Sequence, residues 1–247
     1  MKKILYKMLR MYNISFIIGI FLIMIACENE KDSAKGDYSE YFIENSVEGG
    51  IDFFPLEIYE KYNEADTPHL KLEFLTRDVF SCINYGIAIS KFVNGEELIL
   101  RFDEILLNNI CLTAIGPATA YVDLHENINS LILINGSRVD SYKLDITKEK
   151  VVIYPDNGIF SNLRNKVTFR YPENTFVYEC NVNTSEISIY SDFLEILTAN
   201  LSIVEFNFYG EGWKPYANDW VYRDRQSLTK YFKYENELEF SRAGELL

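Results

Sequence analysis

Apolar and polar residues alternate along the chain from Pro68 to Tyr154. An apolar side chain at every second position is typical of a strand with one face buried. The clearest runs are Leu70, Leu72 and Phe74, then Ile83, Tyr85, Ile87 and Ile89, then Leu98, Leu100 and Phe102. Turn-forming pairs separate such runs at Asn94-Gly95, Asn108-Asn109, Gly116-Pro117 and Asn135-Gly136. The pattern predicts about seven strands, spaced as in a β-sandwich.

The last two of these strands, Leu131 to Ile134 and Val139 to Ile146, flank Asn135-Gly136-Ser137-Arg138. Asn-Gly adopts positive φ at low cost, so we expect a hairpin here. The spacing resembles the closing strands of an immunoglobulin-like domain, although the Cys–Trp–Cys pattern of antibody domains is absent. We therefore expect a mainly β chain with an immunoglobulin-like antiparallel β-sandwich at residues 51–154.

The pattern changes after Pro155-Asp156-Asn157-Gly158. Strands are predicted at 167–171, 176–182 and 203–209, and apolar residues recur at helical intervals from Ile187 to Leu201. The stretch 228–240 fits both periodicities, and we favour a strand. Residues 155–247 are thus predicted to form a small α+β domain with one helix against a sheet.

The N-terminus carries a different pattern, a basic head followed by the apolar run Ile14 to Cys27. The run is shorter than the roughly 20 residues that a membrane-spanning helix needs. A basic head and a short apolar run are typical of a secretory signal peptide, here residues 1–26.

The end of that run, Ile23-Met24-Ile25-Ala26-Cys27, resembles the lipobox of bacterial lipoproteins, with Met24 in place of the usual leucine. The following Glu28-Asn29-Glu30-Lys31-Asp32 resembles the acidic export tag of Bacteroidota-type surface lipoproteins. The resemblance implies a diacylated Cys27 and a lipid-anchored protein of the outer membrane, periplasmic or surface-exposed. Residues 27–50 are then an acidic tether.

Removal of residues 1–26 leaves 20 basic against 37 acidic residues, a net charge of −17. Such a charge repels nucleic acid and anionic lipid headgroups at long range. We therefore expect no nucleic-acid partner.

Three cysteines remain beyond Cys27, and an odd number cannot pair completely within one chain. A Cys82–Cys111 disulfide and three free thiols are both compatible with the sequence. Without a CxxC spacing or an EF-hand loop, the sequence predicts no metal and no cofactor.

The densest aromatic stretch runs from Phe206 to Tyr222 and contains both tryptophans. Trp213, Tyr216 and Trp220 are our candidates for binding a glycan or a partner protein; the alternative is that these aromatics only fill the seam between the two halves. We favour a non-catalytic binding or accessory role. The alternative is a cell-surface hydrolase, such as a glycosidase, with a carboxylate pair, although 37 acidic residues single out no pair.

The lipidation site gives a first prediction. Replacing Cys27 with Ala removes the residue that carries the acyl chains, so the protein should move from the membrane fraction to the soluble fraction. Cys180→Ala is the control and should leave the distribution unchanged. Retention of the Cys27→Ala protein in washed membranes would contradict the anchor.

Overall fold

Strands make up most of the structure, a computed structural model that describes residues 36–59, 68–108, 110–215, 220–222 and 225–246. The chain is mainly β, with 51% strand and 16% helix. Residues 41–247 form one unit, and residues 36–40 belong to another. A short 3-10 helix, η1, spans Ser39–Tyr41.

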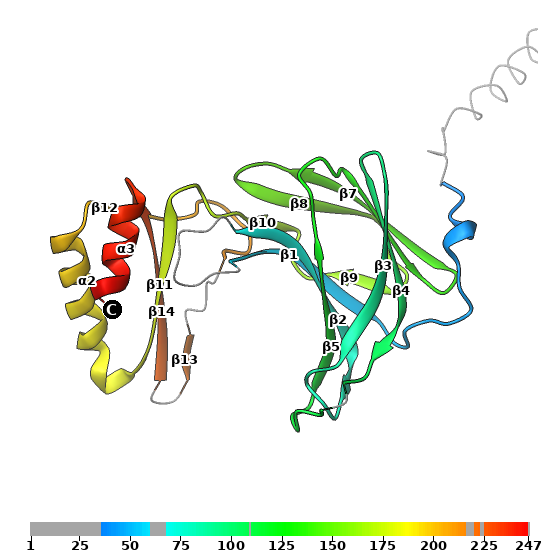
Figure 1. Cartoon of the computed structure of the whole chain (residues 1–247), viewed down its shortest axis with the longest axis horizontal. Helices are drawn as coiled ribbons and strands as arrows, with labels where there is room; N and C mark the ends of the chain where they lie inside the picture. Colours follow the sequence, from blue (N-terminus) through cyan, green and yellow to red (C-terminus); the bar gives the residue numbers. More distant parts are fainter. Residues whose placement is uncertain (1–35, 60–67, 109, 216–219, 223–224, 247) are drawn as a thin grey trace, which may run out of the picture. The chain divides into compact units, whose positions relative to one another are not determined.

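Ten strands form one large curled sheet in the order β10-β8-β7-β6-β4-β3-β5-β2-β1-β9 (Figure 1). Most neighbours are antiparallel, whereas β4–β6, β1–β9 and the single β3–β5 contact are parallel. The strands are β1 Ile51–Ile58, β2 His69–Phe80, β3 Gly86–Asn94, β4 Glu97–Leu106, β5 Gly116–Asp123, β6 Ser130–Asn135, β7 Arg138–Ile146, β8 Lys150–Asn157, β9 Ser161–Leu163 and β10 Val167–Phe169.

The apolar residues of the alternating pattern lie on the inner face of this sheet. Phe53 on β1 contacts Phe74 on β2 and Tyr142 on β7, with ring centroids 5.7 and 4.9 Å apart. Phe74 in turn meets Phe102 on β4 at 5.3 Å. Phe53 and Phe74 face each other on neighbouring strands, whereas β7 lies far from β1 and β4 lies three places from β2 in the sheet order, so the curl brings the rings of Tyr142 and Phe102 to them. Burial of such large apolar side chains is the main stabilising term of the fold.

The hairpin of β6 and β7 turns at Gly136, whose φ is 66°. Two buried polar side chains of this hairpin hold neighbouring backbone segments, the one before β1 and the one that leads into β9. Asn135 accepts a hydrogen bond from the Val47 N–H (2.8 Å) and donates one to the Val47 carbonyl (2.9 Å). The carboxylate of Asp140 accepts from three consecutive backbone N–H groups, at residues 159, 160 and 161. Both side chains are fully buried, and these bonds offset the cost of their burial.

A second, smaller sheet has the order β11-β14-β12, with β13 also paired to β14. Two helices pack on one face of it, as Figure 1 shows. Their shared core includes Tyr178, Tyr190, Leu197, Phe232 and Ala243. The elements are β11 Thr175–Asn183, η2 Thr184–Glu186, α2 Ile187–Asn200, β12 Ile203–Phe206, β13 Trp220–Tyr222, β14 Arg225–Tyr234 and α3 Glu237–Leu246.

The predicted helix near residues 187–201 is confirmed, but the strand predicted for 228–240 is wrong beyond Tyr234. Asn236 accepts hydrogen bonds from the N–H groups of Leu238 (3.1 Å) and Glu239 (3.3 Å) and so caps a second helix, α3. Glutamates alternate at 235, 237 and 239, as they would along an exposed strand edge. A cap asparagine among them outweighs that pattern.

The larger sheet also extends beyond the expected boundary at residue 154. β8 continues to Asn157, and β9 and β10 add edge strands up to Phe169. The strand predicted at 167–171 therefore pairs with β8 in the larger sheet, and the one at 176–182 belongs to the smaller sheet.

Candidate functional site

Trp213, the first candidate for ligand binding, is half-buried and fixed to the larger sheet. Its N–H donates to the Val167 carbonyl (2.8 Å), and its carbonyl accepts from the Phe169 N–H (2.9 Å). Its ring contacts Phe54, with centroids 6.1 Å apart. Trp213 thus serves as a packing residue next to β10. Tyr216 and the side chain of Trp220 lie outside the described residues, and the Trp220 backbone pairs with Ser227.

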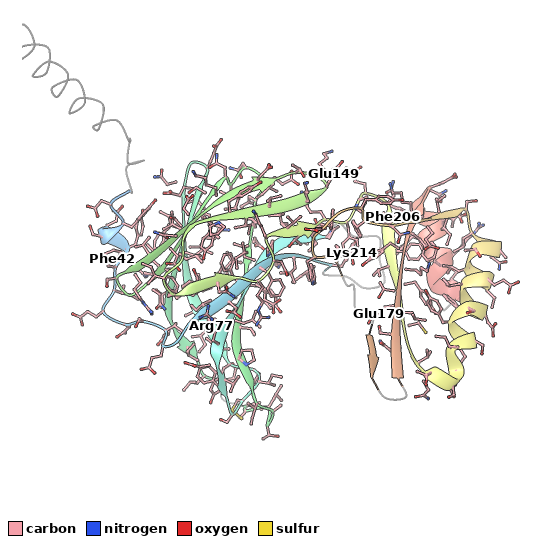
Figure 2. All side chains as sticks on the ribbon, turned by 180° about the vertical axis from the view of Figure 1, so that it is seen from behind. Phe42, Arg77, Glu149, Glu179, Phe206 and Lys214 are labelled. Atoms are coloured by element: carbon pink, nitrogen blue, oxygen red, sulfur yellow. A yellow bond between two sulfur atoms is a disulfide. The ribbon has the colours of Figure 1, made fainter. Side chains whose placement is uncertain are left out.

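The other aromatics of this stretch also pack on neighbours. Phe206, labelled in Figure 2, and Phe208 contact Tyr231 of β14, with ring centroids 5.7 and 5.0 Å away. Phe208 also meets Phe169 of β10 at 5.3 Å. By contrast, the side chain of Tyr209 is 87% exposed. The described part of this segment therefore supports the packing alternative.

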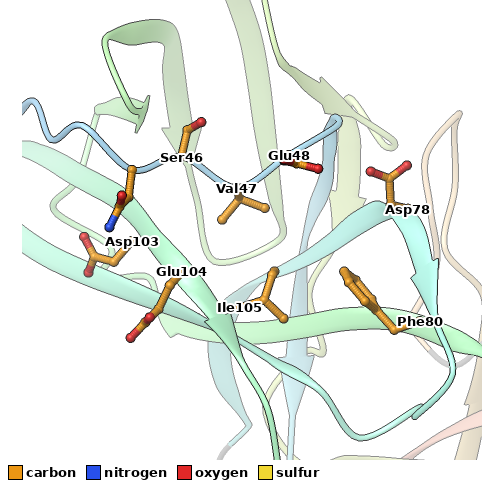
Figure 3. Close-up of a pocket in the computed structure, with 9 residues that line it drawn as sticks. Ser46, Val47, Glu48, Asp78, Phe80, Asp103, Glu104 and Ile105 are labelled. Atoms are coloured by element: carbon orange, nitrogen blue, oxygen red, sulfur yellow. The ribbon is translucent and has the colours of Figure 1, made fainter.

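A groove at one end of the larger sheet is a second candidate site, apart from the aromatic stretch around Trp213 (Figure 3). It has a volume of about 380 Å³, and we call it the acidic groove. Its lining comprises Asn45, Ser46, Val47 and Glu48 from the segment before β1, Asp78 and Phe80 from β2, and Asp103, Glu104 and Ile105 from β4.

Backbone contacts place the first wall of the acidic groove. Val47 is held by Asn135, and two residues later Gly49 adopts a φ of 72°. A Cβ at Gly49 would lie only 2.4 Å from Asp78 Oδ2, so the exposed Asp78 side chain would have to move, and the positive φ of Gly49 favours glycine. The Arg77 N–H then donates to the Gly50 carbonyl (2.8 Å), which fixes the segment beside β2.

The groove combines an apolar floor with uncompensated negative charge. Val47 is buried, Phe80 and Ile105 are half-buried, and Figure 3 shows these side chains between the flanking carboxylates. Asp103 is neutralised by Arg101 Nε (2.7 Å) and also accepts a hydrogen bond from Ser90 Oγ (2.7 Å). Glu48, Asp78 and Glu104 are exposed, and none has an ion-pair partner within the described residues. A cationic group attached to an apolar body complements this arrangement.

In the part of the chain that the structure describes, no group of three or more His, Cys, Asp or Glu side chains is arranged to hold an ion. His69 and His125 are exposed and lie outside the acidic groove.

A second set of carboxylates lies where β1 meets the segment after β10. Glu57 is 5% exposed, and its two oxygens accept from Arg170 Nε (2.8 Å) and the Tyr171 N–H (2.5 Å). Arg170 also pairs with Glu126 at 2.7 Å. Burial raises the pKa of Glu57, and Arg170 offsets part of this rise. Because both of its oxygens accept hydrogen bonds, Glu57 holds Arg170 and Tyr171 in place and has no free oxygen to act as a catalytic acid. We call this arrangement the Glu57 clasp.

Cys82 and Cys111 form a disulfide, one of the two arrangements that the sequence left open. Cys180 is a free, half-buried thiol in β11. The bridge connects the segment after β2 with the segment after β4, both at one end of the larger sheet.

Comparison with known proteins found no counterpart: no protein-family model, no curated protein and no solved structure matches this chain. Of the helices in the described ranges, none has the length and apolar content required to cross a bilayer.

The Glu57 clasp predicts a pH dependence. The pKa of Glu57 is higher in the folded chain than its ordinary value of 4.5, so ionisation of this carboxyl destabilises the folded state. The contribution of Glu57 to the free energy of unfolding therefore falls as pH rises from below 4.5 through the raised folded value. The free energy of unfolding of the native chain, relative to Glu57→Gln, should therefore decrease over this range in denaturant titrations. Glu126→Gln, an exposed partner of the same arginine, is the control. Parallel curves for the native chain and Glu57→Gln would contradict the raised pKa.

Proposed function

We propose that this protein is a lipid-anchored outer-membrane or cell-surface protein with a non-catalytic binding or accessory role, held at the membrane through Cys27. The observation that carries the binding role is the acidic groove, with its apolar floor and three carboxylates that have no ion-pair partner in the described part of the chain. The ligand class it favours is a partner protein that presents a segment with basic and apolar residues.

Charge supports this choice of ligand. The expected mature chain has a net charge of −17, which attracts a basic partner over distances of about a Debye length, ~8–10 Å at ordinary ionic strength. At short range the floor offers apolar contact, which a strongly hydrated ligand such as a glycan uses less well. Trp213 gives little support to glycan stacking, since its backbone and ring are engaged with β10 and Phe54.

The hydrolase alternative rests on the same groove, where Asp103 and Glu104 lie beside each other in sequence. Both line the groove, but Asp103 is already bound by Arg101 and Ser90, so it is not free to act as the partner of Glu104 in catalysis. This arrangement supports a binding surface better than an acid–base pair.

We further propose an immunoglobulin-like sandwich as the closest description of the larger sheet. Its antiparallel hairpins and the aromatic contacts across its inner face support this description. The parallel pairing of β4 with β6 departs from the all-antiparallel pattern. The binding proposal depends on the groove and not on this classification.

The binding role is tested with two synthetic peptides, one alternating lysine with leucine and one alternating glutamate with leucine. The lysine peptide should bind the mature protein at low salt, and the glutamate peptide should not. The double variant Asp78→Asn, Glu104→Gln should weaken binding about tenfold, since each exposed ion pair contributes roughly 0.2–1 kcal/mol.

The matched control is Glu211→Gln, Glu245→Gln, which removes the same charge from exposed positions outside the groove. Calorimetric titration of the three proteins gives the comparison. Equal affinity for both peptides, or equal weakening by the two double variants, would contradict a site in the acidic groove.

A further inference from the structure

Seven large aliphatic side chains are exposed together at one end of the larger sheet, the end drawn lowest in Figure 1. Leu107, Ile110 and Ile115 are the most exposed, at 68, 77 and 76%. We call this surface the apolar tip. Its members are Val79, Ile83, Leu106, Leu107, Ile110, Leu112 and Ile115.

The tip is built from two stretches of sequence without charge. Residues 79–90 and 105–122 contain no Asp, Glu, Lys, Arg or His, whereas 25% of the whole chain is charged. Strand pairing brings the two stretches together, since Phe80 pairs with Gly116 and Gly86 pairs with Leu106. Ile83 packs directly on Gly116, where a Cβ would come within 2.7 Å of Ile83 Cγ1.

A disulfide holds the loops of the tip together, and hydrogen bonds between the loops pair part of their backbone N–H and carbonyl groups. The Cys82–Cys111 disulfide joins them. The side chain of Asn84 donates to the Ile110 carbonyl (2.7 Å) and accepts from the Leu112 N–H (3.1 Å). The Ile83 N–H donates to the Leu112 carbonyl (3.3 Å). Internal pairing of backbone groups is what a loop needs where water is scarce.

We propose that the apolar tip contacts the surface of a lipid bilayer and inserts its aliphatic side chains among the acyl chains. A protein partner is the weaker occupant, because energetically dominant residues of protein interfaces are mainly Trp, Tyr and Arg, and the large hydrophobic side chains exposed at the tip are Val, Ile and Leu. The tip also lacks the negative charge that repels anionic headgroups from the rest of the chain.

The proposal rests on the proposed lipid anchor for the proximity of the bilayer. Between Cys27 and Tyr41, whose carbonyl accepts a hydrogen bond from Arg101 of β4, the chain covers at most about 50 Å when fully extended, so a tethered domain stays close to the membrane. Under this restraint a weakly binding apolar surface has a high local concentration of lipid.

The test places a fluorescent reporter in the tip of the full-length, membrane-isolated protein. Ile110→Trp is reconstituted into phosphatidylethanolamine–phosphatidylglycerol vesicles whose acyl chains carry bromine, which quenches nearby tryptophan. Ile189→Trp, the same change at an exposed position of α2, is the matched control, and the native protein supplies the background of Trp213 and Trp220. We expect several-fold stronger quenching for Ile110→Trp than for Ile189→Trp.

Flotation of the same vesicles measures the anchor separately. If the protein floats and the two variants are quenched equally, the tip contact is overturned while the anchor stands. If the protein does not float, the lipid anchor is wrong, and the tip contact is then tested by measuring tryptophan quenching at increasing lipid concentration. Stronger quenching of Ile110→Trp than of Ile189→Trp supports the contact. Equal quenching of the two variants overturns it. Equal quenching together with a dimer that Ile110→Asn dissociates would show that the tip covers a second copy of the chain, which also overturns the proposal.

Discussion

Two buried polar side chains of the β6–β7 hairpin determine how the irregular parts of the larger sheet are placed. The Asn135 amide makes two hydrogen bonds with the Val47 backbone, and the Asp140 carboxylate accepts three backbone N–H groups of the 159–161 segment. A buried carboxylate or amide without such partners costs several kcal/mol, so these segments are bound to the hairpin. The apolar core stabilises the curl of the sheet. Asn135 and Asp140 hold the segment around Val47 and the segment 159–161 against it.

The acidic groove follows directly from this constraint. Its first wall is the segment that Asn135 holds, and its second wall is the ends of β2 and β4. The apolar tip depends on a different restraint, the Cys82–Cys111 disulfide and the Asn84 side chain. Both surfaces belong to the larger sheet, while the two helices pack on the smaller sheet and Trp213 packs on Phe54.

Much of the larger sheet was predictable, because one buried face forces alternation and Asn135-Gly136 marks a hairpin. The partners of Asn135 and Asp140 were not, since hydrogen bonds across 88 and about 20 residues leave no local pattern. For the same reason the groove could not be found, as Val47 and Glu104 meet only in the fold. The uncharged runs that form the tip were visible in the sequence, but alternation alone assigned them to strands. Trp213 was open to two interpretations until its backbone pairing with β10 was known.

Amide hydrogen exchange of Val47 tests the central claim most directly. Val47 lies outside every strand, so its N–H is protected only if Asn135 accepts it in a buried site. In the native chain this amide should exchange at least tenfold more slowly than those of the exposed neighbours Ser46 and Glu48, and Asn135→Ala should remove roughly 1–3 kcal/mol of that protection. Exchange of Val47 at the rate of these neighbours in the native chain would contradict the account.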